Sequence, residues 1–207
     1  GGGAARSLTR MHVRAPASSA NLGPGFDCLG LALDLPFELA TAASAPEAFL
    51  EVEPTHPAAV AFVAAGGSTE AGLRWRSPIP SGRGLGFSGA ARVAGAYLAG
   101  LVDGLDHDAA RDGAYVVATD LEGHPDNAAA SAYGGFTVAV EDRVVSLPVP
   151  PSLRVVVWSP EGEVSTDRSR LVLADAVSLP DATFSVGRAA LWVAALAAGD
   201  LAALRTA

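Results

Sequence analysis

The sequence predicts an α+β fold. Segments with the apolar alternation of strands are interleaved with alanine-rich segments typical of helices, and the spacings between them include both hairpin-like and crossover lengths. A regular doubly wound sheet would show crossover spacings throughout. Half of the 207 residues are hydrophobic, so the chain can bury a sizeable core, as one large domain or as one domain and part of a second.

Strands dominate the first part of the chain. Residues 11–16 alternate as in a short strand, and residues 26–43 carry two further strand-like runs that we expect to be broken at Pro36. Residues 49–54 predict another short strand. The alanine-rich residues 57–66 then predict a helix that ends at glycine, because glycine readily adopts the left-handed backbone found after helices.

The middle of the chain predicts two strands and three helices around polar loops. Residues 72–82 alternate as in a strand with one face toward solvent. Residues 84–104 pass from a glycine loop into a helix closed by Gly104, and a second helix is expected over residues 107–121. Residues 122–140 predict a polar loop, a short helix and, after two glycines, a strand.

Three prolines between residues 148 and 151 predict a domain boundary. We therefore divide the chain into a disordered leader or residues added for expression at 1–10, an N-terminal domain at 11–148 and the start of an incomplete C-terminal domain at 149–207. In the last part, residues 153–160 predict a buried strand. A helix is expected to begin within residues 165–174, and residues 184–207 predict a helix with a break at Gly199.

Charge and composition exclude several functions. The net charge is −8 and all 14 basic residues are arginine, so no basic surface of the kind that binds nucleic acid is expected. Without lysine, phosphate groups must be bound by arginine, backbone N–H groups, helix N-termini or a metal ion.

Cys28 is the single cysteine, so no internal disulfide exists. No run reaches the roughly 18 apolar residues of a membrane helix. A soluble, cytoplasmic protein without a nucleic-acid or membrane partner is expected.

The glycine-rich segment "PIPSGRGLGFSGAARVAG", residues 78–95, has the features of a phosphate-binding loop. Glycines allow a backbone to approach a phosphate closely, and the following helix supplies free N–H groups and the positive end of its dipole. Ser88 can cap this helix or bind a metal ion through its hydroxyl, and Arg83 can add positive charge. The segment lacks the Gly-Lys-Ser/Thr ending of a Walker A motif. The alternative is a flexible loop before a helix of small residues.

A second polar segment, "LEGHPDNAAA" at residues 121–130, brings Glu122, Asp126 and Asn127 together at the start of a predicted helix. Carboxylates beside a phosphate loop are the hard oxygen ligands that Mg²⁺ prefers. The alternative is helix capping, with Asp126 or Asn127 as the N-cap. His124, beside a proline turn, is interpreted as a solvated loop histidine rather than a base.

Two further pairs of polar residues are candidates for ligand binding. Asn21 and Asp27 flank a Gly-Pro-Gly turn between apolar segments, where they either bind a ligand or shape the turn. Thr166 and Arg170 are four residues apart and share one face if their segment is helical. Arginine is the natural bidentate partner of a carboxylate. The alternative is a surface arginine paired with an acidic neighbour.

Three segments, "APASSANLGPGFDCLGLAL", "GRGLGFSGAA" and "EGHPDNAAASAYGGF", occur here in the same order as in the GHMP kinases, which the chain resembles. The first and third are most similar to segments of the homoserine kinase family, and the likeness runs from about Met11 to the end. The resemblance implies an N-terminal domain like domain 2 of ribosomal protein S5 and a ferredoxin-like C-terminal domain, of which only the start is present.

The resemblance also implies an activity. Members of the homoserine kinase family transfer the γ-phosphate of ATP to the hydroxyl of L-homoserine, giving O-phosphohomoserine for threonine biosynthesis. ATP and Mg²⁺ are the cofactors, and homodimers are common in the family. The small-molecule substrate agrees with the absence of features for binding nucleic acid or membranes.

By motif match, the resemblance assigns roles to individual residues. The phosphate loop would comprise Pro80, Gly82, Arg83, Gly84, Leu85, Gly86, Phe87, Ser88 and Gly89. The magnesium ligands would be Ser88 and Glu122. The amino acid would be bound by Asn21, Asp27, Asn127, Thr166 and Arg170.

The implied charges suit a zwitterionic substrate. Asp27 offers negative charge to the α-ammonium group, and Arg170 offers a bidentate partner to the α-carboxylate. The aspartate base of mevalonate kinases corresponds here to Asn127, so no general base is expected. Phosphoryl transfer needs mainly positioning and charge neutralisation. Mg²⁺, held by Ser88 and Glu122, the loop N–H groups and the helix dipole are therefore expected to supply most of the rate, while Asn127 orients the hydroxyl.

The chain departs from the family pattern in three respects. Phe87 and Gly89 replace the first serine and the alanine of the usual Gly-Leu-Gly-Ser-Ser-Ala loop. Residues 55–70 lack the asparagine expected near the adenine, and a C-terminal glycine-rich segment with a second substrate arginine is absent. Two other interpretations stay open, a relative that binds ligand without turnover and a kinase for another small alcohol. A neutral alcohol would leave Asp27 and Arg170 unpaired, at a cost of roughly 1–3 kcal/mol each.

Overall fold

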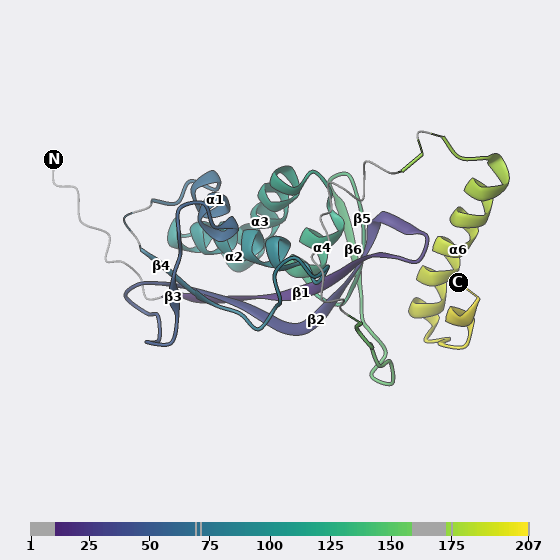
Figure 1. Ribbon diagram of the computed structural model, residues 1–207, viewed down its shortest axis with the longest axis horizontal. Helices are drawn as coiled ribbons and strands as arrows, with labels where there is room; N and C mark the ends of the chain where they lie inside the picture. The colour runs from purple at the N-terminus through teal and green to yellow at the C-terminus, as the bar shows by residue number, and fades with distance from the viewer. Residues whose placement is uncertain (1–10, 69, 71, 159–172, 175, 207) are drawn as a thin grey trace.

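In the computed structural model, an antiparallel sheet is covered on one face by a layer of four helices (Figure 1). The structure describes residues 11–206 apart from 69, 71, 159–172 and 175. Six strands form the sheet, in the order β3-β4-β2-β5-β6, and β1 pairs with β2 beside this path. Helices and an antiparallel sheet in one chain confirm the predicted α+β class.

A long hairpin forms the centre of the sheet. β1 (His12–Leu22) pairs with β2 (Gly25–Thr41) along almost its whole length. The predicted break at Pro36 is wrong, because β2 continues through it. Pro16 and Pro36 face each other across the pair, and the register shifts immediately beyond Pro16. Proline lacks a backbone N–H, so a strand tolerates it where such a bulge already interrupts the ladder of hydrogen bonds.

Four shorter strands extend the sheet on both sides of β2. β4 (Leu73–Arg76) pairs with the end of β2, and β3 (Leu50–Glu51), shorter than the strand predicted there, pairs with β4. On the other side, β5 (Phe136–Val140) pairs with β2 and forms a hairpin with β6 (Arg143–Leu147). The sequence analysis predicted the first strand of this hairpin but not the second.

The four covering helices begin and end within a few residues of the predicted positions. They are α1 (Pro57–Ala64), α2 (Phe87–Val102), α3 (His107–Glu122) and α4 (Asp126–Tyr133). In α3, residues at the two ends of the helix account for the success of the prediction from sequence. The carboxylate of Asp106, its N-cap, accepts a hydrogen bond from the Ala109 N–H, and Gly123 ends the helix with a φ of 79°.

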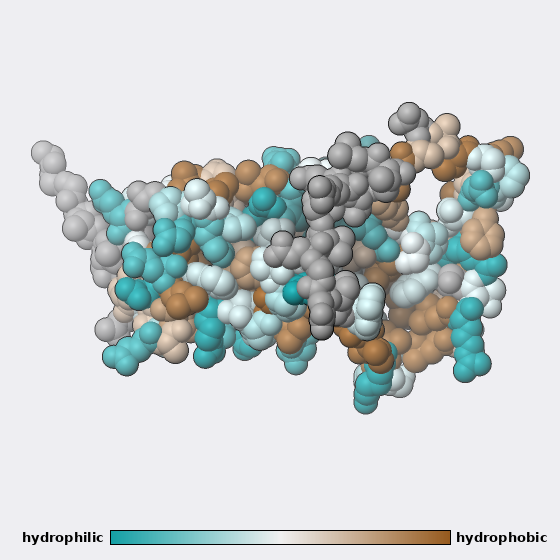
Figure 2. All heavy atoms as spheres, in the orientation of Figure 1, coloured by the Kyte–Doolittle hydropathy of each residue, from teal (hydrophilic) through white to brown (hydrophobic). Residues whose placement is uncertain are grey.

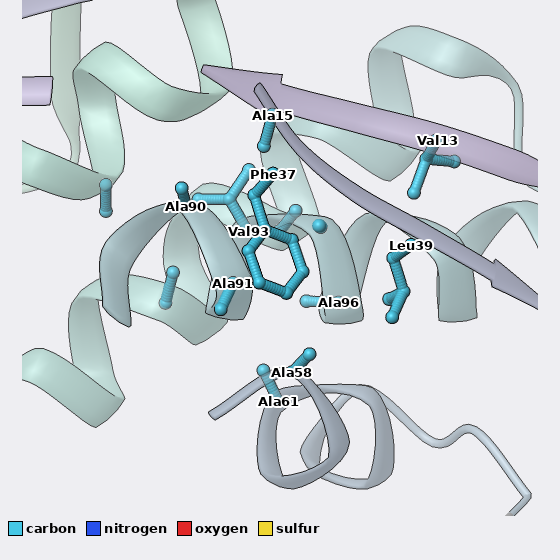
Figure 3. Packing of buried hydrophobic residues seen from close by; sticks show 14 of the residues in the cluster. Val13, Ala15, Phe37, Leu39, Ala58, Ala61, Ala90, Ala91, Val93 and Ala96 are labelled. Atoms are coloured by element: carbon cyan, nitrogen blue, oxygen red, sulfur yellow. The ribbon is translucent and has the colours of Figure 1, made fainter. Parts of the chain in front are cut away.

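Small side chains fill the core between the sheet and the helices. Phe37 on β2 lies beside the α2 residues Ala91 and Val93, and alanines of α1 face the same space (Figure 3). Small residues also bring the helix backbones close together. A Cβ atom on Gly95 of α2 would lie 2.1 Å from the carbonyl oxygen of Ala58 on α1. The contact between these helices therefore depends on the absence of a side chain.

The C-terminal helix covers part of the opposite face of the sheet. α6 (Leu179–Ala198) is followed by a short 3₁₀ helix (Ala203–Arg205), and α6 lies near the turn of the β1–β2 hairpin (Figure 1). Gly30 of β2 faces α4, so its neighbour Leu29 faces the other side, where it belongs to a cluster with Trp192 of α6. Among the described residues, no helix is both long enough and apolar enough to span a membrane.

The buried strand predicted for residues 153–160 is contradicted in the part that the structure describes. Residues 153–158 form no strand, and Val156 and Trp158 are 92% and 83% exposed. An apolar run forms a strand only where a neighbouring strand can pair with its backbone, and none of the described strands does so here. Exposed apolar side chains also gather near α6, on the right of Figure 2, and include Phe184. Most of the helix predicted within 165–174 lies outside the described residues.

Candidate active site

A cleft of roughly 980 Å³ lies where the glycine loop meets the start of α2, the end of α3 and the start of α4. Both polar segments noted in the sequence line it, together with the end of β1. We call its two parts the glycine-loop end and the acidic end. The glycine-loop end comprises residues 80–88 with Arg92 and Glu122. The acidic end comprises Asn21, Asp27, His124 and Asp126, of which Asn21 and His124 line the cleft directly, and Asn127 lines the cleft between the two ends.

The glycine loop turns sharply onto the N-terminus of α2. Gly82, Gly84 and Gly86 all have a left-handed backbone, with φ values of 68°, 72° and 66°. Gly86 is the N-cap of α2, and no side chain caps the helix. The first N–H groups of a helix have no partner within the helix, so they are available to an anion in the cleft. Eight of the nine predicted loop residues line this cleft, and Gly89 lies just inside α2.

Ser88 does not cap α2, as one interpretation of the sequence held. Its hydroxyl instead donates a hydrogen bond to the Glu122 carboxylate, with 2.6 Å between Oγ and Oε1. Arg92 forms an ion pair with the same carboxylate oxygen. Glu122 is nearly buried, with a side chain 4% exposed, so Arg92 compensates much of the cost of burying its charge.

The pair formed by Ser88 and Glu122 has the chemistry of a magnesium site. A hydroxyl and a carboxylate oxygen, both hard donors, are in contact on the wall of the cleft next to the helix N-terminus. These residues would therefore suit a divalent ion, which would supply positive charge beside the helix N-terminus. The sequence analysis missed Arg92. A helical spacing of four residues places Arg92 on the same face as Ser88, and that spacing was the available signal.

At the acidic end, Asn21 and Asp27 are linked through the backbone. The Asp27 N–H donates to Oδ1 of Asn21 at 2.8 Å, across the Gly-Pro-Gly turn. Both residues adopt the left-handed region, with φ values of 56° and 57°. Asn and Asp tolerate this conformation better than other non-glycine residues. Asn21 therefore shapes the turn and also lines the cleft, so the two roles considered from the sequence are combined in one residue.

Neither Asp126 nor Asn127 caps α4. The N-cap is Pro125, and Asp126 is the first helical residue. Asp126 is completely buried, and its Oδ1 lies 2.7 Å from Nδ1 of His124 and accepts a hydrogen bond from the Asn127 N–H at 2.9 Å. Within the described part of the chain, its Oδ2 has no hydrogen-bond partner. The prediction of a solvated His124 is wrong, because its side chain is only 11% exposed and is held by Asp126.

The acidic end concentrates negative charge. One ligand atom each of Asp27, His124 and Asp126 lie within 4.8 Å of one another. Burial raises the pKa of the neighbouring Cys28 thiol, and the charges of Asp126 and Asp27 raise it further, so this thiol stays protonated at neutral pH. Two carboxylates at this separation attract a cationic group, which an α-ammonium would supply.

Asn127 lies between the two ends of the cleft. Its Oδ1 accepts a hydrogen bond from the hydroxyl of Ser18, on β1, at 2.9 Å. Thr166 and Arg170, the other predicted substrate residues, lie outside the described residues. Ser18 belongs to the first of the three family segments, but a serine within a strand pattern carries no local signal for a contact with a residue 109 positions away.

An aromatic cluster borders the glycine-loop end. Phe87 packs edge-on against Phe37, Trp75 and His56, with ring centroids 5.6–5.8 Å apart. Burial lowers the pKa of His56, which keeps its imidazole neutral at pH 7. His56 and Phe87 both line the cleft. The substitution of a loop serine by Phe87 therefore has a packing role that the sequence alone did not indicate.

Comparison with known proteins agrees with this geometry. The family model for the N-terminal domain of GHMP kinases matches residues 55–135. A homoserine kinase from Thermus thermophilus is 43% identical over 213 residues, which cover 97% of this chain and 72% of the relative. A homoserine kinase from Mycobacterium tuberculosis is 40% identical and matches 87% of this chain and 65% of its own length.

A solved structure from Listeria monocytogenes, assigned as a homoserine kinase, superimposes with a TM-score of 0.72 at 28% identity. It covers 93% of this chain, which in turn covers 71% of that structure. The fold and the cleft thus define a GHMP kinase, an ATP-dependent enzyme with a small-molecule acceptor. Within that class, the chain belongs to the homoserine kinase family.

Proposed function

We propose that the chain transfers the γ-phosphate of ATP to the side-chain hydroxyl of L-homoserine, giving O-phosphohomoserine and ADP, as a step of threonine biosynthesis in the cytoplasm. The observation that carries this proposal is that a single cleft joins a glycine loop at a helix N-terminus to an acidic end with Asn127 between them. The 43% identity to a homoserine kinase supports the choice of acceptor.

The glycine-loop end suits the phosphates of ATP. The uncapped N-terminus of α2 offers N–H groups and the positive end of the helix dipole, and Arg83 and Arg92 line the same space. Ser88 and Glu122 are the residues that would hold Mg²⁺, which supplies positive charge to neutralise the phosphate oxygens when bound. Arg92 already shares the Glu122 carboxylate, so it steadies this ligand.

The acidic end suits the amino-acid head group. Asp27 would bind the α-ammonium group, and the buried charge of Asp126 adds to the attraction without needing to contact the substrate. Thr166 and Arg170 are proposed for the α-carboxylate, as the family resemblance implies. Opposed charges of this kind favour a zwitterion, because a neutral alcohol would leave both charges unpaired.

The chemistry would depend on positioning rather than on a base. The Asn127 amide cannot take a proton at neutral pH, but its Nδ2 can donate a hydrogen bond to the acceptor oxygen and so hold it toward the glycine loop. Phosphoryl transfer passes through a loose transition state, so alignment and charge stabilisation supply most of the rate. The domain division at residue 148 and the homodimer implied by the resemblance remain predictions, and light scattering of the purified chain tests the dimer.

The experiment is a coupled assay of ADP release with ATP, Mg²⁺ and L-homoserine, with serine, threonine and mevalonate as parallel acceptors. It is run on this chain and on a chimera extended with the C-terminal residues of the Thermus relative. Turnover that requires homoserine supports the proposal. Turnover with another acceptor would reassign the substrate. If neither protein released ADP although both were well folded, a relative that binds ligand without phosphoryl transfer would be favoured.

A further inference from the structure

We propose that Ser18 is a positioning residue, which couples the glycine loop to Asn127 and so sets the distance between the phosphates and the acceptor hydroxyl. This inference rests on the proposed kinase function. Ser18 lies on β1 and is completely buried, so it does not line the cleft. Any effect on the reaction must therefore pass through the residues that it contacts.

Ser18 forms hydrogen bonds to both the glycine loop and Asn127, through its backbone and its side chain respectively. Its backbone N–H donates to the carbonyl oxygen of Leu85, in the glycine loop, at 3.2 Å. Its hydroxyl donates to Oδ1 of Asn127, on α4, at 2.9 Å. The two bonds join segments that are 42 residues apart along the chain, since Leu85 and Asn127 are at those positions. One residue on the central hairpin thus fixes the loop relative to the helix.

Gly86 shows how closely these parts fit. A Cβ atom on Gly86 would lie 2.1 Å from Oγ of Ser18 and 3.0 Å from Oδ1 of Asn127. The loop backbone therefore packs directly on the hydrogen bond between Ser18 and Asn127. A displacement of that bond would press on the loop at Gly86, the N-cap of α2.

The direction of this hydrogen bond determines what Asn127 presents to the cleft. Because Oδ1 accepts from Ser18 and Asn127 lines the cleft, we infer that the two N–H donors of the amide are the groups available to an acceptor bound there. Without the Ser18 hydroxyl, the amide can rotate and present its oxygen instead. An acceptor hydroxyl would then be held in more than one orientation, and the fraction in line with the γ-phosphate would fall.

The chain offers a matched control in Ser131. This serine is 3% exposed, lies on α4 and donates one hydrogen bond to the carbonyl oxygen of Pro16, on β1, at 2.9 Å. It joins the same two elements as Ser18, but its partner is a backbone carbonyl outside the cleft, whereas the partner of the Ser18 hydroxyl is the cleft residue Asn127. Ser131→Ala and Ser18→Ala each remove one hydrogen bond of a buried hydroxyl, so the two variants are expected to lower the melting temperature by similar amounts.

The experiment compares steady-state kinetics of the wild type, Ser18→Ala and Ser131→Ala with homoserine and ATP. Ser18→Ala should lower kcat on the order of 10-fold to 100-fold, with KM for ATP changed by less than about threefold. Ser131→Ala should keep the wild-type kcat. Ser18→Cys, which keeps a donor that is weaker and slightly larger than the hydroxyl, should give a kcat between those of the wild type and Ser18→Ala, and it serves if Ser18→Ala does not fold. Equal kcat values for Ser18→Ala and Ser131→Ala would overturn the inference.

A double-mutant cycle separates coupling from a general structural effect. If Ser18 acts through Asn127, adding Ser18→Ala to Asn127→Ala should cause no further loss of kcat, whereas full additivity would contradict the proposal. A readout independent of turnover is the NMR signal of the Asn127 side-chain amide, assigned with Asn127→Ala. That signal should shift or broaden in Ser18→Ala but not in Ser131→Ala. An inactive wild type with these amide changes would count against the kinase function alone, whereas an unchanged amide would count against the inference.

Discussion

The two ends of the cleft differ in whether backbone groups or side chains determine their chemistry. At the glycine-loop end the loop itself is a backbone structure, with three left-handed glycines and an uncapped helix N-terminus, beside the side chains of Arg92 and Glu122. The acidic end depends on side chains, since Oδ1 of Asn21 accepts a hydrogen bond from the Asp27 N–H and the side chains of His124 and Asp126 are bonded to each other. A backbone site depends on the path of the chain, whereas a side-chain site depends on the identity of single residues.

This difference leads to different responses to mutation. At the glycine-loop end, a substitution that alters the backbone should disturb nucleotide and acceptor together, because Gly86 packs on the Ser18–Asn127 bond. At the acidic end, a substitution that removes charge should change the affinity for the amino acid and leave nucleotide binding intact. Three substitutions in the cleft test this separation and one outside the cleft provides a comparison, beginning with the largest expected effect.

Gly86→Ala should be the most damaging single change. Its φ of 66° disfavours any Cβ, and the new atom would lie 2.1 Å from Ser18 Oγ, so the loop must move. We expect kcat/KM to fall on the order of 10²-fold or more, since misplacement by about 1 Å has that effect. Gly84→Ala is the matched control, because Gly84 has a φ of 72° but no atom within 4 Å of the position that its Cβ would occupy. Steady-state kinetics of the two variants separate the effect of the steric clash with Ser18 from the effect of backbone strain. Equal losses of kcat/KM in the two variants would argue against the clash.

Glu122→Gln should come next. It removes the charge that Ser88 and Arg92 contact and, under the proposed function, a magnesium ligand. We expect kcat to fall by about 10²-fold, as for other groups that stabilise charge in the transition state, together with a higher Mg²⁺ requirement. Titration of activity with Mg²⁺ measures this. Asp108→Asn, on the same helix α3, removes an exposed partner of Arg111 and should leave the magnesium dependence unchanged.

Asp126→Asn should affect the acceptor but not the nucleotide. Loss of its buried negative charge should raise KM for homoserine on the order of 10-fold, as expected for a lost interaction with a charged group, and leave KM for ATP unchanged. The same assay with 4-hydroxybutanoate, which lacks the ammonium group, should show no such rise. A parallel increase in both acceptor KM values would point to a structural role for Asp126.

Glu38→Gln, away from the cleft, should have the smallest effect on activity. Arg76 lies 2.7 Å from Glu38 across the sheet and holds the pKa of that carboxyl below its ordinary value, mainly through their hydrogen bond. Glu38 therefore stabilises the fold at neutral pH, and its contribution is lost as pH falls from its unfolded pKa through the lowered folded one. Between pH 7 and pH 3, the melting temperature of Glu38→Gln should fall less steeply than that of the wild type. A change in kcat at pH 7 would contradict the assigned position outside the site.

Local signals in the sequence predicted the helices well and the sheet less well. The helices α1 to α4 follow from alanine-rich runs with recognisable ends, such as Asp106 and Gly123 around α3. The break at Pro36 was predicted wrongly because the bulge that accommodates it is formed with a partner strand 20 residues earlier in the chain. Residues 153–158 show the opposite error, since an apolar pattern alone cannot supply a strand partner.

The candidate site was predictable where motifs carry it and not where long-range contacts do. The loop glycines and Glu122 were identified from their motifs. Arg92 and Ser18 were missed because their significance depends on partners 30 and 109 residues away. The burial of His124 and Asp126 was missed for the same reason, since only the packed fold determines which polar groups lose access to water.

The contact between α1 and α2 has a consequence for how the cleft could be tuned. Gly95 leaves room only for the backbone of α1 at Ala58, two residues after His56 and one after Pro57, both of which line the cleft. A larger residue at Gly95 would act as a spacer and push these two residues aside. The width of the cleft beside the glycine loop is thus governed from inside the core, at a position that does not line the cleft, so adjustment of specificity need not begin at the site itself.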